Sequence, residues 1–309
     1  MYNRSRKNLT SDEVREFAQA MSQIDFNDPS QRKAVAETIV TELRDIIEKD
    51  DVIAALGADV QTFLPGQSIQ FVTRKGVKAF VHEPGSYAPR STIANRVQSL
   101  MTEMVSVHPE LEIGQLKSGR YGTVQDLKDM ALEELLGRKY GIVWSTLINS
   151  ISTASTTQYW TVGSTDTAAA KKAAVDSGFD YVADKSSVVA ILGRRTALSW
   201  MADYNAYSAT YTGPSEQKKV QLDTTPYPQA YRGVPVIMLN QYTDGWGTNV
   251  ITNNQIMIVG KDTVKIGVDR PLDFMESIDV NTLMWHIHIY ESYGVGVFFP
   301  ERNARIALT

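Results

Sequence analysis

Histidines are the side chains of this chain with the clearest potential for metal or acid-base chemistry. His286 and His288 are two residues apart in a stretch with the pattern of a strand, so both point to one face and could share a metal ion. Two ligands are too few for a metal site, and the nearest acid, Glu291, has the opposite parity. The spacing favours half-buried or interface histidines, and no metal ligand is predicted.

Two further pairs place a histidine beside an acid, His82-Glu83 and His108-Pro109-Glu110. Neither is accompanied by a nucleophile elbow or a second catalytic element. Gly294-Val295-Gly296 lacks the third glycine and the following helix of a dinucleotide-binding loop. The chain has no cysteine, which excludes disulfides, thiolate metal ligands and cysteine nucleophiles. We therefore expect no catalytic residue and no cofactor.

The composition is that of an ordinary globular protein, with 309 residues, 43% of them hydrophobic and 21% charged. The net charge of -4 gives no general attraction for phosphate backbones. Lys171-Lys172, Arg194-Arg195 and Lys218-Lys219 are scattered basic pairs that favour interface salt bridges or solvation over DNA contact. No apolar run approaches the roughly 20 residues that cross a bilayer. We expect a protein without membrane contact that stays in the cytoplasm where it is made.

Helical signals begin near the N-terminus. Thr10 and Glu13 form a capping box before a helix to about Met21. A second helix begins near Ser30, and its apolar residues fall on one stripe that needs a partner surface, in this subunit or in a neighbour. The stripe consists of Val35, Ile39, Leu43 and Ile46.

The longest helical pattern runs from Val124 to about Asn149, with Thr123 as its cap. Gly137 and Gly141 interrupt it, and each costs about 1 kcal/mol relative to alanine, so a bend or a close approach is expected there. The stretch is compatible with one helix or two. Its apolar positions include Leu127, Met130, Leu135, Val143 and Leu147.

Strand periodicity predicts a hairpin before this helix. Residues 69–73 and 77–82 alternate apolar and polar side chains on either side of Arg74-Lys75-Gly76, where Gly76 can take a positive φ. An isolated two-stranded ribbon is marginal in water, so we expect a long arm that lies on another subunit. Its predicted contact residues are Ile69, Phe71, Arg74, Lys75, Gly76, Val77 and Phe80.

The second half mixes helices and strands. Asp166 is placed to cap a helix from 168 to 176 that Gly178 stops, and a helix or buried segment follows from 188 to 204. Residues 107–113 and 256–259 have the pattern of strands.

Two turns lead into further strands. Tyr231-Arg232-Gly233-Val234-Pro235-Val236 predicts a turn that enters a buried strand, and Gly260-Lys261-Asp262 leads into residues 264–268. A long strand follows from Thr282 to Phe299.

This order of elements resembles the Hong Kong 97-type fold of tailed-phage major capsid proteins. The most recognisable pieces are the strand entry at 231–236 and the closing Val297-Phe298-Phe299-Pro300 with Ala304. The resemblance implies an α+β fold with an N-terminal arm, an extended hairpin loop, a long spine helix, and peripheral and axial domains. The implied divisions are the arm with its helices (1–62), the hairpin loop and a flanking peripheral-domain strand (63–122), the spine helix (123–152), the axial domain (153–271) and the peripheral return strand (272–309).

The resemblance also implies a function. A protein of this kind assembles into the hexamers and pentamers of an icosahedral phage head, meets a portal and possibly scaffolding or decoration proteins, and encloses double-stranded DNA without reading its sequence. Its place is the virion capsid, assembled in the host cytoplasm, and it is not an enzyme. An encapsulin-like nanocompartment shell is the alternative, since it shares the architecture, and a two-lobed enzyme is a third reading.

Overall fold

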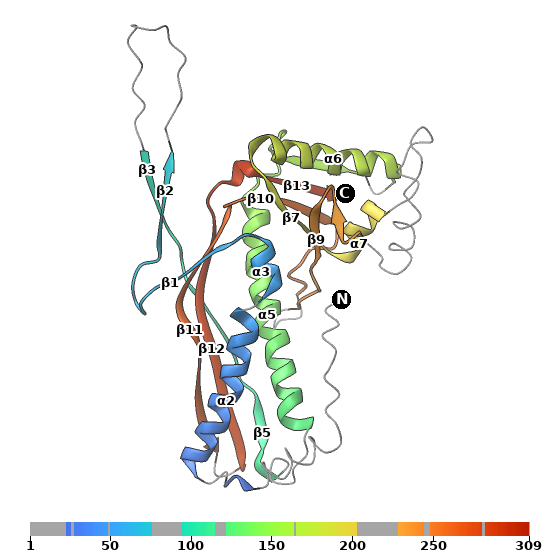
Figure 1. Ribbon diagram of the computed structural model, residues 1–309. Helices are drawn as coiled ribbons and strands as arrows, with labels where there is room; N and C mark the ends of the chain where they lie inside the picture. The colour runs from blue at the N-terminus through green and yellow to red at the C-terminus, as the bar shows by residue number, and fades with distance from the viewer. Residues whose placement is uncertain are drawn as a thin grey trace.

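The computed structural model describes residues 23–25, 28–48, 50–75, 94–114, 122–163, 165–202, 228–243, 248–279 and 282–308. Figure 1 shows a long lower body in which helices lie beside a sheet, a compact upper lobe, and a ribbon that projects from the body. The expected α+β class is confirmed. The predicted capping box of Thr10 and Glu13 lies outside the described residues.

Helix α2 (Pro29–Glu48) packs on the long sheet and on α5. Ile39 and Leu43 are 3% and 1% exposed, which confirms the middle of the predicted apolar stripe, whereas Val35 and Ile46 at its ends are only half-buried. Its partner surface is in the same subunit. A short helix, α3 (Asp51–Ala55), follows, and Asp50 caps it by accepting the N–H of Val52.

Helix α5 (Gly122–Asn149) is one continuous helix, which settles the choice between one helix and two. Its buried face includes four of the five predicted positions, Leu127, Leu135, Val143 and Leu147. Met130 is instead 68% exposed, because the buried residues of this part of the helix repeat every four positions, as at Leu127 and Ala131, and Met130 lies about 100° around the helix from Ala131.

The close approach predicted at the two glycines of α5 is confirmed. A Cβ at Gly137 would lie 2.5 Å from Cδ2 of Tyr242, and one at Gly141 would lie 2.8 Å from Cγ1 of Val250. Tyr242 and Val250 therefore pack directly on the helix backbone, which only glycine permits at this distance.

The long sheet has the order β1 (Asp59–Thr62), β11 (Val264–Asp279), β12 (Met284–Val297) and β4 (Glu103–Val107), and β5 (Glu110–Glu112) also pairs with β12. The predicted strand from 282 to 299 is confirmed as β12, with slightly shorter bounds. The single strand expected from 107 to 113 is wrong, because His108-Pro109 separates β4 from β5 and proline cannot donate to a ladder.

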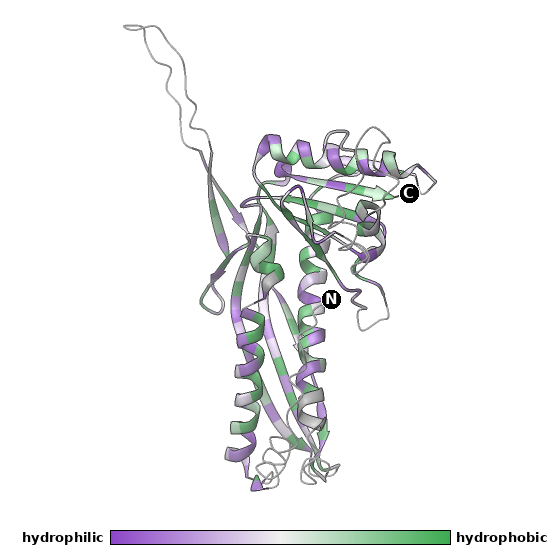
Figure 2. Cartoon of the chain, turned by 45° about the vertical axis from the view of Figure 1, so that its right-hand side comes forward, coloured by the Kyte–Doolittle hydropathy of each residue, from purple (hydrophilic) through white to green (hydrophobic). Residues whose placement is uncertain are grey.

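The upper lobe is a six-stranded sheet covered by α6 (Ala168–Lys185), as Figure 1 shows. Its apolar strands stand out in Figure 2. The short segments α7 (Arg195–Leu198), η1 (Ser199–Ala202) and η3 (Pro300–Arg302) complete the described part of this region. In order, the strands are β6 (Tyr159–Val162), β13 (Asn303–Leu308), β10 (Gln255–Gly260), β7 (Val188–Gly193), β9 (Val234–Met238) and β8 (Ala230–Tyr231).

Two predicted helix limits in this lobe are wrong. Thr167, not Asp166, caps α6, because its side chain accepts the N–H of Ala170. Gly178 does not end the helix but faces the sheet, where a Cβ would lie 3.2 Å from side chains of Ile258 and Ile306. The segment that starts at 188 is the buried strand β7, followed by the short helices.

The turns into strands are confirmed. Arg232 and Gly233, with φ of 50° and 82°, form a two-residue turn between β8 and β9. The turn after Gly260 leads into β11, which lies wholly in the long sheet and spans the boundary expected at 271. The last strand, β13, belongs to the upper sheet. Residues 272–309, which are expected to form one peripheral return strand, are therefore divided between the long sheet and the upper sheet. The division into peripheral and axial domains itself stays a prediction.

Candidate assembly interface

The projecting ribbon is an antiparallel pair, β2 (Gln70–Lys75) with β3 (Ala94–Ser99). The turn predicted at Arg74-Lys75-Gly76 is wrong, because Arg74 and Lys75 pair with Asn95 and Ala94 inside the ladder. The partner of β2 is therefore β3 rather than residues 77–82. Of the predicted contact residues, Gly76, Val77 and Phe80 lie outside the described part of the chain.

The root of the ribbon is anchored in this subunit. Ile69 and Phe71 are 1% and 2% exposed, and the Phe71 ring lies edge-on to Phe298 at 5.5 Å. Lys265 Nζ lies 5.0 Å from the centre of the Phe71 ring. Ile69 and Phe71 therefore belong to a local core and cannot supply exposed contact area, contrary to their prediction as contact residues. Their burial fixes the direction in which the ribbon leaves the body.

The opposite face of the ribbon has one uncovered apolar pair among polar residues such as Gln70 and Ser99. Val72 and Val97 face each other across the ladder and are 53% and 55% exposed. Among the described residues no third strand pairs with either ribbon strand. Sequence reasoning missed Val97, because the hairpin was paired with the wrong segment. The signal available in the sequence was that Phe71 and Val72 are adjacent apolar residues. Successive side chains of a strand point to opposite faces, so one of the two can be buried while the other is exposed.

The histidines lie together on one face of the long sheet. On β12 the side chains of Trp285, Ile287 and Ile289 are buried on the helical side, so His286 and His288 occupy the other face. His286 Nδ1 is 3.3 Å from a Glu110 carboxylate oxygen.

His288 has a different neighbour. It stacks on His108 with ring centres 3.7 Å apart. Burial and the neighbouring His108 lower the pKa of His288. In the described ranges, no three histidine, aspartate or glutamate side chains gather in a group that could hold a metal ion. His82 lies outside those ranges.

Buried ion pairs hold the helices on this sheet. Lys139 of α5 and Glu291 of β12, whose side chains are each 9% exposed, lie 3.4 Å apart. Arg32 of α2 pairs with Glu276 at 3.1 Å, and Glu276 also accepts the indole N–H of Trp285. Glu291 thus faces the helix, on the side opposite the histidines, as its parity predicted. Both pairs join segments distant in sequence, so no local pattern pointed to them.

The turn at Arg232 is held by a polar cluster. Arg232 Nη2 lies 2.9 Å from Asp176 on α6 and also pairs with Asp180. Lys172, one member of a predicted basic pair, bonds to Asp176 at 2.6 Å within the same helix. This basic residue is therefore used inside the subunit. Lys218-Lys219 lies outside the described residues.

None of the helices in the described ranges combines the length and apolar character needed to cross a bilayer.

No protein-family model matches the sequence, and no curated protein is significantly similar to it. Solved structures do match. A structure from the Mycobacterium phage Ogopogo is 14% identical, covering 83% of this chain and 92% of that chain, with a TM-score of 0.59. The capsid of the cyanophage P-SCSP1u is 13% identical over 82% of this chain and 86% of that one, with a TM-score of 0.55. A virus-like particle from Pyrococcus furiosus is 11% identical over 87% and 96%, with a TM-score of 0.54. The α+β architecture of this chain is therefore a capsid fold, shared with phage structures and with a virus-like particle.

Proposed function

We propose that this chain is a major capsid protein of the Hong Kong 97 type, which assembles into the hexamers and pentamers of an icosahedral phage head. The observation that carries the proposal is the match to a phage capsid over 82% of this chain and 86% of the other. A match of that extent leaves little of either chain for an unrelated activity. The shell would enclose double-stranded DNA, join a portal, and form in the host cytoplasm with or without scaffolding or decoration proteins.

In this proposal the ribbon is the element that overlaps a neighbouring subunit. Its open face carries Val72 and Val97, and a neighbour that covers them would gain the burial that this subunit does not supply. The lower body with α5 would form the peripheral domain and the upper lobe the axial domain. Many modest contacts of this kind, repeated by symmetry, make a closed shell cooperative.

We also infer that the chain is not an enzyme. Its buried charged residues are used in packing, as Lys139 with Glu291, and its described histidines are paired with Glu110 or with each other. A stable monomer that turns over a substrate, and that forms no shell at high concentration, would contradict this inference.

An encapsulin-like shell is the second candidate, and the match to the Pyrococcus furiosus particle favours it. The two candidates differ in what the particle holds. Particles that carry a long DNA genome support the phage head, whereas small particles that carry a protein cargo support the nanocompartment.

Electron microscopy of the purified, overexpressed protein tests the proposal directly. We expect rings, tubes or closed shells at high protein concentration. Dispersed monomers under all conditions tested would contradict both shell readings.

A further inference from the structure

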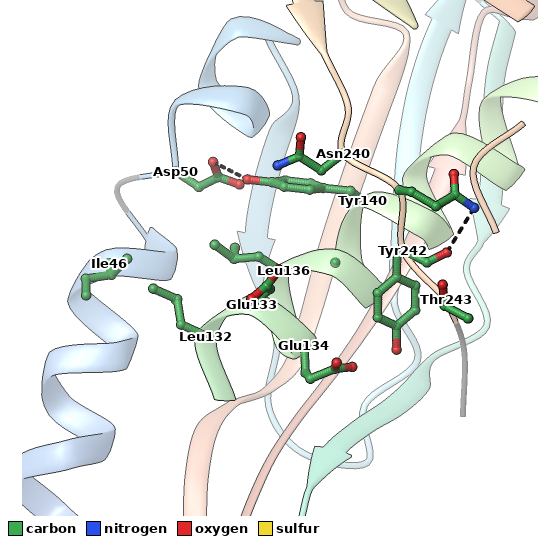
Figure 3. A pocket seen from close by; sticks show the side chains of 12 residues that line it. Ile46, Asp50, Leu132, Glu133, Glu134, Leu136, Tyr140, Asn240, Tyr242 and Thr243 are labelled. Atoms are coloured by element: carbon green, nitrogen blue, oxygen red, sulfur yellow. Dashed lines mark hydrogen bonds between the residues drawn. The ribbon is translucent and has the colours of Figure 1, made fainter. Parts of the chain in front are cut away.

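A cavity of about 380 Å³ lies between the C-terminal part of α2, the middle of α5 and residues 240–243 (Figure 3). Its size falls within the range of about 300–1,000 Å³ typical of small-molecule sites. Ile46, Leu132 and Leu136 supply apolar walls. The ribbon does not contribute to it, so the cavity is separate from the interface described above.

The charged residues that line the cavity are all acidic. They are Asp50, Glu133 and Glu134, and the described lining contains no lysine, arginine or histidine. Asp50 is 7% exposed and directly precedes α3, and it contacts α5 through the Tyr140 hydroxyl, whereas Glu133 and Glu134 are exposed on α5 itself. Figure 3 shows Asp50 beside the Tyr140 hydroxyl, with the two glutamates on the helix below that ring.

Two residues that line this cavity each have a buried acceptor oxygen that receives no donor from the described part of the chain. Asp50 Oδ1 accepts hydrogen bonds from the Val52 N–H and from the Tyr140 hydroxyl, at 3.1 and 2.8 Å. Asp50 Oδ2 and Gln241 Oε1 are both buried and receive no hydrogen bond from the described residues. A buried acceptor without a donor is costly, so an occupant that brings hydrogen-bond donors would be favoured.

We propose that this cavity binds an alkyl diamine or polyamine. An ammonium group offers three donors and a positive charge, which suits the unpaired oxygens of Asp50 and Gln241. The methylene chain would pack on Leu132 and Leu136, and a second ammonium would reach Glu133 or Glu134. An anion is disfavoured by the three carboxylates, and an uncharged apolar ligand would leave both acceptors unpaired.

Calorimetric titration of the full-length protein tests this assignment with spermidine, putrescine and 1,4-butanediol. Putrescine and the diol have the same four-carbon chain, so they differ only in their end groups. We expect saturable binding of both amines at one site per chain and none of the diol. Equal binding of the diol, or no amine binding, would overturn the proposal.

Paired variants locate the site. Glu133→Gln with Glu134→Gln removes two exposed charges at the cavity and should weaken spermidine binding about tenfold. Glu37→Gln with Asp184→Asn removes two exposed acids outside the cavity lining and should leave the affinity unchanged. Asp50→Asn retains the capping oxygen and should abolish binding. If the control pair weakens spermidine binding equally, the effect is due to net charge, and the assignment of the site to this cavity is wrong.

A lysine side chain of a protein has the same ammonium chemistry. Nα-acetyl-lysine methylamide, which mimics that side chain, therefore serves as a further probe. Tighter binding of spermidine than of this analogue supports a free polyamine as the ligand. The reverse order would overturn that assignment and point to a lysine of a partner protein.

Discussion

At the scale of single residues, Val72 and Val97 are the side chains on which the proposed subunit contact depends most directly. Val72→Asp with Val97→Asp would place two like charges opposite each other on the ribbon, on its open face. We expect the subunit to keep its circular dichroism spectrum and its urea midpoint, because both positions are already about half exposed. Sedimentation velocity should show that assembly is lost.

The matched control replaces both residues with isoleucine. Val72→Ile with Val97→Ile keeps the apolar surface and the β-branched shape, so these subunits should assemble. Normal particles from the aspartate variant would show that the open face of the ribbon is not an interface.

Lys139 and Glu291 provide a second residue-scale prediction, on stability. Glu291→Leu would leave the Lys139 ammonium buried without its partner, which should lower the free energy of unfolding by about 3 kcal/mol. Lys139→Met combined with Glu291→Leu should recover most of that loss, since no charge stays buried. Urea denaturation of the single and double variants measures both effects. A double variant as unstable as the single one would argue against this account of the pair.

At the scale of elements, the ribbon is a separable unit. Joining Phe71 directly to Gln98, its register partner, through an Asn-Gly turn removes residues 72–97 but keeps the anchored root. The truncated subunit should fold with a near-normal melting temperature and fail to form shells in negative-stain images. A deletion of residues 68–82 would instead remove Ile69 and Phe71 from the local core and confuse folding with assembly.

Helix α5 and the segment packed on it form a second element-scale test. Gly137→Ala would normally stabilise a helix by about 1 kcal/mol, but here the new methyl group would meet the Tyr242 ring. We therefore expect a net loss of about 1–3 kcal/mol from overpacking. Adding Tyr242→Ala should make the same glycine replacement favourable in chemical denaturation. If Gly137→Ala instead raises the free energy of unfolding, the Tyr242 ring can move away from the helix at little cost.

At the scale of the whole molecule, the proposed shell should stabilise its own subunits. Assembly binds folded chains and not unfolded ones, so subunits in particles should unfold at a higher temperature than dispersed ones. Calorimetry at one chain concentration, comparing the native protein with the Val72→Asp, Val97→Asp variant, measures this difference. Identical melting temperatures for particles and dispersed subunits would contradict a stabilising lattice.

Local chemistry in the sequence was sufficient to predict several elements of this molecule. Apolar periodicity identified α2, α5 and β12 because a buried stripe must repeat with the geometry of its own element. The glycines of α5 predicted a close approach, which Tyr242 and Val250 make. The predicted limits of α6 at Asp166 and Gly178 are wrong. The first depends on which side-chain oxygen caps the helix, and the second depends on which surface the glycine faces.

Only the tertiary structure decided how these elements are used. Pairing β2 with β3 rather than with residues 77–82 assigned Phe71 to the core and Val97 to the open face, a choice that alternation alone leaves undetermined. The Lys139 and Glu291 contact and the acidic cavity beside Tyr140 bring together residues far apart along the chain. Sequence patterns record which side chains need burial, whereas long-range packing determines which partner buries them and which faces stay uncovered.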